Sequence, residues 1–261
     1  MEWKKEKQET AFSADAIKQQ RPVAMKENRH MKKQKALLSC VLVILMLGSA
    51  AAFATEVDPN YVPPPVYPSG DYSYYINEDK TSVTICGYEG DAEELVIPTE
   101  LDGYPVTEIG YQAFSYVKVK SLTIPDRIRE IQRRAFEYCV VSERFTLPED
   151  VFIGGDAFSY ASLPDLIVIP RGAQLDRCAF SYCKTGETLI VQPGAVIGER
   201  CFGYSKQLKT VFCESGSVLK ADAFEYCRVL EQAILCSDVQ MDEDAFSYCG
   251  SARFLVVAPL R

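Results

Sequence analysis

One four-residue motif, Ala-Phe-x-Tyr, recurs seven times in this chain at a constant interval of 22 residues. The copies begin at Ala113, Ala135, Ala157, Ala179, Cys201, Ala223 and Ala245. A fixed period of roughly 20 to 29 residues is typical of a solenoid, in which each repeat is one coil that buries its apolar face against the neighbouring coils. The sequence therefore predicts a repeat protein, whose specificity depends on side chains that the repeat leaves free to vary.

Alignment of the coils on this motif separates the side chains expected inside from those expected outside. The Phe, the aliphatic residue four places before the Ala and the small residue three places after the Phe keep their chemical kind along the coils, so we expect them in the core. The Phe and the small residue would share one face of a helical turn, from which the Tyr would point outward. Apolar residues ten and twelve places after the Ala predict a strand.

Two of these strand segments, Leu208-x-x-Val211-x-Cys213 and Leu230-x-x-Ala233-x-Leu235, match the strand half of a leucine-rich repeat. Together with Leu95-Val96-Ile97-Pro98 and the turn Ala-Phe-x-x-Cys, the pattern resembles the BspA-type bacterial leucine-rich repeat. The resemblance covers about residues 72–261. It implies an α/β repeat solenoid of seven 22-residue coils, with a parallel β-sheet on one face and short helical turns opposite.

The resemblance also implies a place and a role for the protein. Members of the family are typically exported surface proteins of host-associated microbes, and some are linked to adhesion to host proteins or to other bacteria. We therefore expect an extracellular, secreted or cell-surface binding module that contacts a host or bacterial surface protein. The alternative is a structural surface protein that associates with copies of itself and has no dedicated ligand.

Residues 1–54 are interpreted as an N-terminal extension followed by a signal peptide. A basic stretch ends at Lys35, the apolar run Ala36–Leu47 follows, and Ala52-Phe53-Ala54 has the small residues that signal peptidase recognises. The alternative is an uncleaved signal anchor, because residues 36–54 are just long enough to cross a bilayer.

The rest of the chain divides into two parts. Residues 55–71 contain Pro63-Pro64-Pro65 and are expected to form a Pro-rich, extended linker. Residues 72–261 are expected to form the solenoid. Two strand-like segments flank the polar stretch Asn77–Lys80, which predicts a β-hairpin that caps the first coil.

The composition excludes several classes of function. Without residues 1–54, the chain keeps 18 Lys and Arg against 31 Asp and Glu, a net charge near −13. We therefore expect no nucleic-acid partner, and membrane contact only through an uncleaved N-terminal segment. His30, the single His of the sequence, lies in that segment, so the remainder can form neither a His-containing catalytic triad nor a His-ligated metal site.

The carboxylates Asp222 and Asp244 could in principle act as an acid–base pair. Both precede the Ala of a motif, where Asp commonly caps a helix, so we interpret them as helix caps. We expect no enzymatic activity, no catalytic residue, no cofactor and no metal.

Nine cysteines remain after residue 54. Those in the inward small-residue column are expected to be buried thiols that act as small apolar side chains: Cys139, Cys183, Cys227 and Cys249. Four others lie off that column and are the better candidates for disulfides in an exported chain: Cys86, Cys178, Cys201 and Cys236.

The outward position of the predicted strands changes from polar to apolar along the solenoid. The early coils have Thr123 and Thr146 there. The later coils have Val168, Ile190, Phe212, Ile234 and Val256, bordered by Leu166 and Phe254. Contiguous exposed apolar surface usually marks an interaction site, so these seven apolar residues are the main candidates for protein contact. The alternative is that Val, Ile and Phe only reflect the preference of strands for such residues.

The Tyr column is a weaker candidate. Its rings are expected to stack into an aromatic ribbon on the outer surface: Tyr116, Tyr138, Tyr160, Tyr182, Tyr204, Tyr226 and Tyr248. Aromatic faces bind sugars and protein partners. The alternative is that each ring only covers the coil beside it.

Overall fold

The computed structural model describes residues 62–184, 186–250 and 252–258. The predicted signal segment, residues 1–54, and residues 55–61 of the predicted linker lie outside these ranges. Nowhere in the described ranges is there a helix with the length and apolar character needed to cross a membrane.

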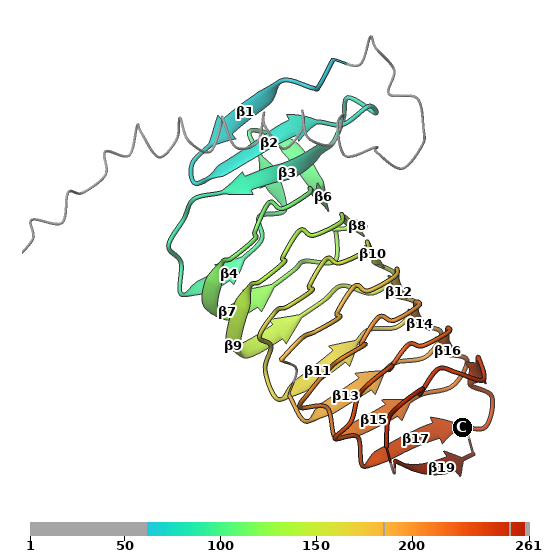
Figure 1. The fold of residues 1–261 in the computed structure, drawn as a ribbon. Helices are drawn as coiled ribbons and strands as arrows, with labels where there is room; N and C mark the ends of the chain where they lie inside the picture. Colours follow the sequence, from blue (N-terminus) through green and yellow to red (C-terminus); the bar gives the residue numbers. More distant parts are fainter. Residues whose placement is uncertain (1–61, 185, 251, 259–261) are drawn as a thin grey trace, which may run out of the picture.

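An antiparallel hairpin forms the N-terminal end of the fold (Figure 1). It consists of β2 (Tyr72–Ile76) and β3 (Val83–Tyr88), which flank the turn predicted at Asn77–Lys80. β3 also pairs in parallel with β6 (Tyr104–Ile109), and β6 pairs in parallel with the first short strand of the coils. The predicted cap is therefore confirmed, and its sheet runs without a break into the solenoid.

The linker prediction was wrong for one short segment. β1 (Val66–Ser69) pairs antiparallel with β2 and extends the cap by one strand. Pro68 is compatible with this strand because β1 lies at the edge of the sheet, where a missing N–H group costs no ladder hydrogen bond. Residues 62–65, which contain the three prolines, have no regular secondary structure.

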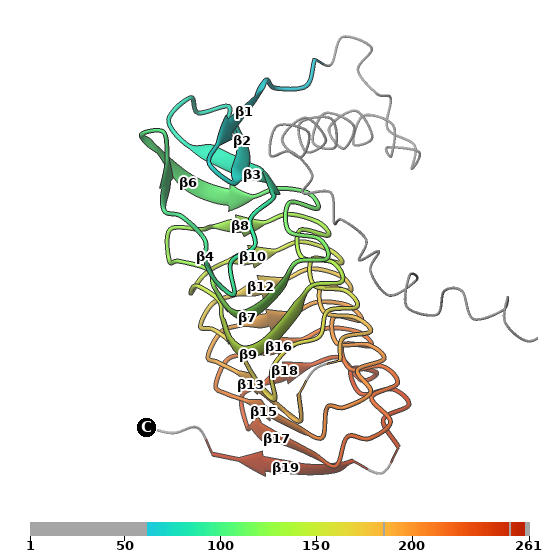
Figure 2. The ribbon, with the colours of Figure 1, turned by 90° about the vertical axis from the view of Figure 1, so that its left-hand side faces the viewer.

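Each regular coil contributes two strands, and the strands of successive coils pair in parallel (Figures 1 and 2). The longer sheet has 11 strands and continues from β6 through six two-residue strands: β8 (Glu130–Ile131), β10 (Phe152–Ile153), β12 (Gln174–Leu175), β14 (Val196–Ile197), β16 (Val218–Leu219) and β18 (Gln240–Met241). β5 (Glu100–Leu101) adds to it as a hairpin with β6, through the turn Asp102-Gly103.

The longer strands, which are those predicted from the repeat, form two further parallel sheets. The first consists of β4 (Glu94–Val96), β7 (Lys118–Thr123) and β9 (Val140–Thr146). The second consists of β11 (Leu166–Ile169), β13 (Thr188–Val191), β15 (Thr210–Cys213), β17 (Gln232–Cys236) and β19 (Arg253–Val257). The expectation of one parallel sheet per solenoid therefore missed the short strand of each coil.

The turns that carry the Ala-Phe-x-Tyr motif are not helical, and the described residues contain no helix. In the third motif, Asp156 and Tyr160 have φ of 59° and 60°, which an α-helix cannot accommodate because its residues need φ near −63°. The N–H groups of Phe158 and Tyr160 donate to carbonyls of the next coil at 2.7 and 3.0 Å, instead of to carbonyls of their own turn. The prediction of helical turns was wrong. The spacing of Phe and Cys indicates that the two side chains share a face, but it does not show which carbonyls accept the hydrogen bonds of the backbone N–H groups.

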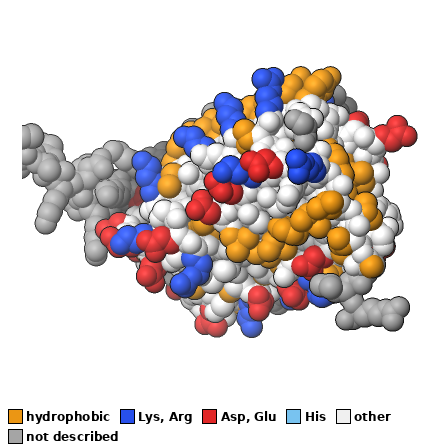
Figure 3. All heavy atoms as spheres, turned by 90° about the horizontal axis from the view of Figure 1, so that it is seen from below, with side chains coloured by type: hydrophobic (Ala, Val, Ile, Leu, Met, Phe, Trp, Pro, Cys, Tyr) orange, Lys and Arg blue, Asp and Glu red, His pale blue; other side chains and the backbone are white. Residues whose placement is uncertain are grey.

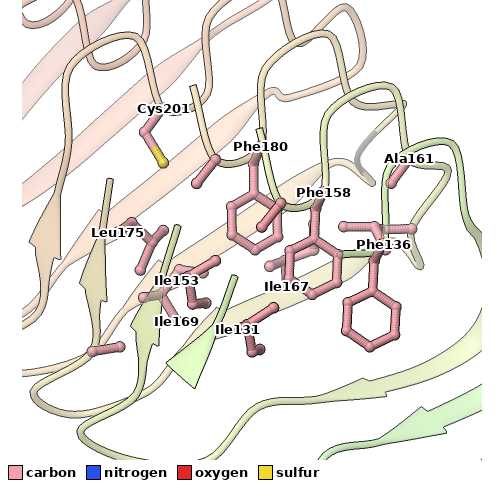
Figure 4. Close-up of a cluster of buried hydrophobic side chains, with 14 of the residues drawn as sticks. Ile131, Phe136, Ile153, Phe158, Ala161, Ile167, Ile169, Leu175, Phe180 and Cys201 are labelled. Carbon is pink, nitrogen blue, oxygen red and sulfur yellow. The ribbon is translucent and has the colours of Figure 1, made fainter. Parts of the chain in front are cut away.

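The core consists of columns of side chains of one kind that run along the solenoid (Figure 4). Phe136, Phe158 and Phe180 are fully buried, and their rings stack with centroids 4.9 and 4.7 Å apart. The aliphatic column, which includes Ile131 and Ile153, packs opposite them, as predicted. Met241 belongs to this column but is exposed, because β18 is the last described strand of its sheet.

The small-residue column explains why several coils have Cys after the Tyr. Cys183 is buried and its thiol donates to the carbonyl of Phe158, one coil earlier, at 3.0 Å. Cys227 and Cys249 repeat this contact with Phe202 and Phe224. Cys is therefore both a small apolar residue and a weak donor here.

The disulfide expectation fails for three of its four cysteines, since Cys178, Cys201 and Cys236 are free thiols. Cys201 occupies the Ala position of its motif and is fully buried, so no second thiol reaches it from solvent.

We expect the buried thiols to be unreactive in the folded protein. Burial raises the pKa of Cys139 and of Cys213 to about 12, so both remain protonated and inaccessible at about pH 8. A chromogenic disulfide reagent, with mass mapping of the labelled peptides, should modify the half-buried Cys178 and Cys236 first. It should reach Cys139 and Cys213 only after guanidinium unfolding. Labelling of Cys139 in the folded protein as fast as Cys178 would contradict this.

Candidate functional site

One apolar column crosses the outward face of the five-stranded sheet. It contains the residues that pair in register across the five strands: Val168, Ile190, Phe212, Ile234 and Leu255. We call these five residues the outward stripe. All five are at least partly exposed, and the exposed fraction reaches 36% at Phe212 and 49% at Leu255. The residues on either side within a strand, such as Val211 and Cys213, are buried. Core packing therefore does not account for the stripe.

The register of the last strand differs by one residue from the sequence alignment. Leu255, and not Val256, pairs with Ile234. Phe254 and Val256 pair instead with Ala233 and Leu235, which point inward. The segment between turn and strand is one residue shorter in this coil, and a shift of one residue moves a strand's side chains to the opposite face. The assignment of Phe254 and Val256 to the outward face was therefore wrong.

Phe254 and Val256 are nevertheless exposed, because β19 pairs with a described strand on one side only. Seen from below, toward the C-terminal coils, apolar side chains gather in a band across the molecule (Figure 3). The exposed apolar residues of β19 contribute to the apolar surface of this region: Phe254, Leu255, Val256 and Val257. The stripe and this terminal apolar surface meet at Leu255.

Polar side chains border the outward stripe. Leu166, 51% exposed, begins a second outward column at the edge strand β11, but the column then continues with polar or charged residues: Thr188, Thr210, Gln232 and Arg253. On the other side, Gln192 and Glu214 follow β13 and β15. Of the candidates from the sequence, Leu166 therefore lies beside the stripe and only Val168, Ile190, Phe212 and Ile234 lie within it. An apolar centre with a polar rim is typical of protein–protein interfaces.

The predicted stack of tyrosines is present. The seven rings of the Tyr column stack with centroids 4.6 to 5.0 Å apart and interplanar angles of 3° to 24°. Each ring therefore covers the faces of its neighbours, and the inner rings present only edges and hydroxyls to solvent. Tyr116 and Tyr248, 65% and 66% exposed, end the stack and have the free faces. A role of the inner rings in binding through their faces is incompatible with this packing.

Two of the inner phenols titrate above the ordinary range. Partial burial within the stack raises the pKa of Tyr160 and of Tyr204, and neighbouring tyrosines and carboxylates add to the effect. The hydroxyls of Tyr160 and Tyr204 therefore stay protonated at neutral pH.

The described residues hold no group of three or more His, Cys, Asp or Glu side chains that could bind a metal ion. Asp222 does not cap a helix, since its turn is not helical. It lies instead in the left-handed region with φ of 55°, where short polar side chains are tolerated, and its carboxylate accepts a hydrogen bond from Arg200 at 3.3 Å. The carboxyl of Asp222 is therefore paired with a guanidinium of the previous coil.

The sequence between residues 91 and 253 matches the family described as BspA type leucine rich repeat region, in two overlapping stretches, 91–193 and 144–253, with six copies. The chain belongs to the BspA-type leucine-rich repeat family. Leucine-rich repeats of this type are typically modules that bind other proteins rather than enzymes. The resemblance inferred from the repeat is thus confirmed over most of the solenoid.

Several solved structures are similar in fold. A leucine rich cell surface protein from Faecalibacterium prausnitzii is 17% identical over 74% of this chain and 94% of its own, with a TM-score of 0.34. The T. pallidum leucine rich repeat protein is 20% identical over 72% and 91%, with a TM-score of 0.43. The pneumococcal vaccine antigen PcpA is 16% identical over 74% of this chain and 50% of its own, with a TM-score of 0.45. No curated protein matches the sequence.

Proposed function

We propose that this chain is an exported, surface-displayed binding module that holds another protein against the outward stripe. The observation that carries the proposal is the register of five apolar side chains across five strands, on a face that the core does not use. At the strand spacing of about 4.8 Å, the stripe is about 19 Å long. That is enough for the apolar centre of a standard interface.

The composition of the stripe fits a contact surface. Phe212 lies at its middle, and binding energy in interfaces concentrates in a few central residues, with aromatic side chains prominent among them. The surrounding Thr, Gln and charged side chains supply a rim that stays hydrated. With a net charge near −13 after residue 54, the chain favours partners that are not themselves strongly acidic.

Self-association is the second candidate, and the terminal apolar surface favours it. β19 has a described strand neighbour on one side only and carries exposed Phe254 and Val256. Unpaired strand edges with apolar side chains are templates for pairing with another chain.

One experiment separates the two candidates. The exported chain is immobilised and exposed to purified host matrix proteins and to bacterial surface extracts, while light scattering follows the molar mass of the same preparation. We expect the chain to be monomeric and to capture a protein in a saturable way. An excess of free chain should compete with this capture. A mass that rises with concentration, without capture of any other protein, would support self-association instead.

A further inference from the structure

The two aromatic stacks of the solenoid end differently below the cap. Tyr88, in β3, continues the Phe stack, with its ring 5.3 Å from that of Phe114 and tilted by 28°. The Tyr stack has no such continuation among the described residues, and the outer face of Tyr116 is left bare. At the level of the cap, one rung of the Tyr stack is therefore vacant.

A cavity of about 340 Å³ lies at the vacant rung. One wall is the turn of the first coil, from Phe114 to Lys118, which includes the ring of Tyr116. The other wall comes from the cap, with the ring of Tyr88 and the segment Gly90–Ala92. Asp91 and Lys118, one acidic and one basic residue, are among the lining residues. Its volume lies within the range of small-ligand sites, roughly 300 to 1,000 Å³.

Backbone acceptors are also vacant at this rung. In each regular coil, the N–H groups of the motif's Phe and Tyr donate to carbonyls of the next coil; Phe114 donates to Ala135 at 2.8 Å and Tyr116 to Glu137 at 3.0 Å. The equivalent carbonyls of the first motif belong to Ala113 and Ser115. By the repeat geometry they point toward the cap, yet no backbone N–H group of the described residues donates to them. Ser115 itself lines the cavity.

We propose that this cavity binds an aromatic residue of a partner peptide, which takes the place of the missing rung. Its ring stacks on the free face of Tyr116, as the rings of neighbouring coils do at 4.6 to 5.0 Å. Its backbone N–H donates to the carbonyl of Ser115, as Tyr116 donates to Glu137 one coil on. Asp91 and Lys118 then lie beside the peptide's flanking amide groups. The site is separate from the outward stripe and extends the proposed function to short aromatic peptide segments.

The test uses the full chain and small probes observed by NMR. N-acetyl-tyrosinamide is titrated first, and N-acetyl-leucinamide, which lacks the ring, is the comparison. A tyrosine probe methylated on its amino-acid nitrogen lacks the N–H that Ser115 would accept, and methyl β-glucoside represents a sugar ligand. We expect shifts of the Asp91, Ser115 and Tyr116 amide signals with the tyrosine probe. We expect binding to weaken by about fivefold or more with each of the other three.

A matched pair of variants isolates the stacking contact. Tyr116→Leu should weaken binding of N-acetyl-tyrosinamide by about fivefold or more, because it removes the free ring face. Tyr248→Leu changes a ring of nearly equal exposure at the other end of the stack and should leave the affinity unchanged. Equal binding by the two variants would overturn the proposal. Two results with the wild-type chain, which need no variant to fold, would also overturn it. These are tighter binding of the glucoside than of N-acetyl-tyrosinamide, and amide shifts that lie away from the cavity.

Discussion

Phe180→Ala is expected to lower the free energy of unfolding by about 3 to 5 kcal/mol. Phe180 is fully buried in a central coil, and its ring stacks on Phe158 at 4.7 Å and on Phe202 at 5.1 Å. The rings on either side cannot move into the space, because backbone hydrogen bonds fix the distance between coils; Phe158 N–H to Ala179 O, for example, is 2.7 Å. The substitution therefore leaves most of the ring's volume as a cavity.

Tyr182→Ala is the control, since it removes a ring of similar size from the same turn. Tyr182 also stacks on both neighbours, at 4.9 and 4.7 Å, but is 42% exposed. Its loss should cost about 1 to 2 kcal/mol, mainly the stacking contribution and the covered part of the ring. Urea melts of both variants give the comparison. Equal losses for Phe180→Ala and Tyr182→Ala would show that the division into inner and outer aromatic columns is wrong.

The core could be predicted from the sequence because each of its columns is defined by one kind of side chain. Phe at one position and Ile or Leu at another, repeated every 22 residues, leave little choice of which side chains face inward. The short strands could not be predicted in the same way. A two-residue strand such as Phe152–Ile153 has no alternation of its own, and only its pairing with Gln174–Leu175 defines it.

The backbone conformation of the turns could not be predicted from the sequence either. Tyr is not a residue that normally adopts positive φ, yet Tyr160 does so at 60°. The inter-coil hydrogen bond from its N–H to Ser181 holds this conformation, and stacking on Tyr138 and Tyr182 supports it. Such bonds exist only once the coils are stacked, so local propensity gives no sign of them.

The register of the outward residues was predicted correctly where the coil length is constant, and the prediction failed where the coil length changes. Ile190, Phe212 and Ile234 follow each other at 22-residue steps and pair as expected. The next step is 21 residues, to Leu255, although the Ala-Phe-x-Tyr motif keeps its interval. The motif fixes the turn but not the number of residues between turn and strand. The cavity beside Tyr116 was not foreseen either, because it depends on a ring that the cap does not supply.

The double substitution Phe212→Ser and Ile234→Ser is expected to abolish binding of the captured partner while leaving the fold intact. These adjacent residues form the centre of the outward stripe, and truncation of a central interface residue costs about 2 kcal/mol or more, a factor of roughly 30 in affinity for each. Their side chains point away from the core, so the free energy of unfolding should change by no more than about 1 kcal/mol.

The matched control is Thr210→Ala with Gln232→Ala, which changes the neighbouring outward column on the same two strands. Binding of the partner and a thermal melt are measured on one preparation of each variant, since this measurement most directly tests whether the stripe is the binding surface. We expect binding to be lost in the Phe212/Ile234 variant and kept in the Thr210/Gln232 control, with nearly equal melting temperatures. Unchanged binding by the Phe212/Ile234 variant, together with a loss of about 1 kcal/mol in stability, would show that the stripe reflects strand propensity alone.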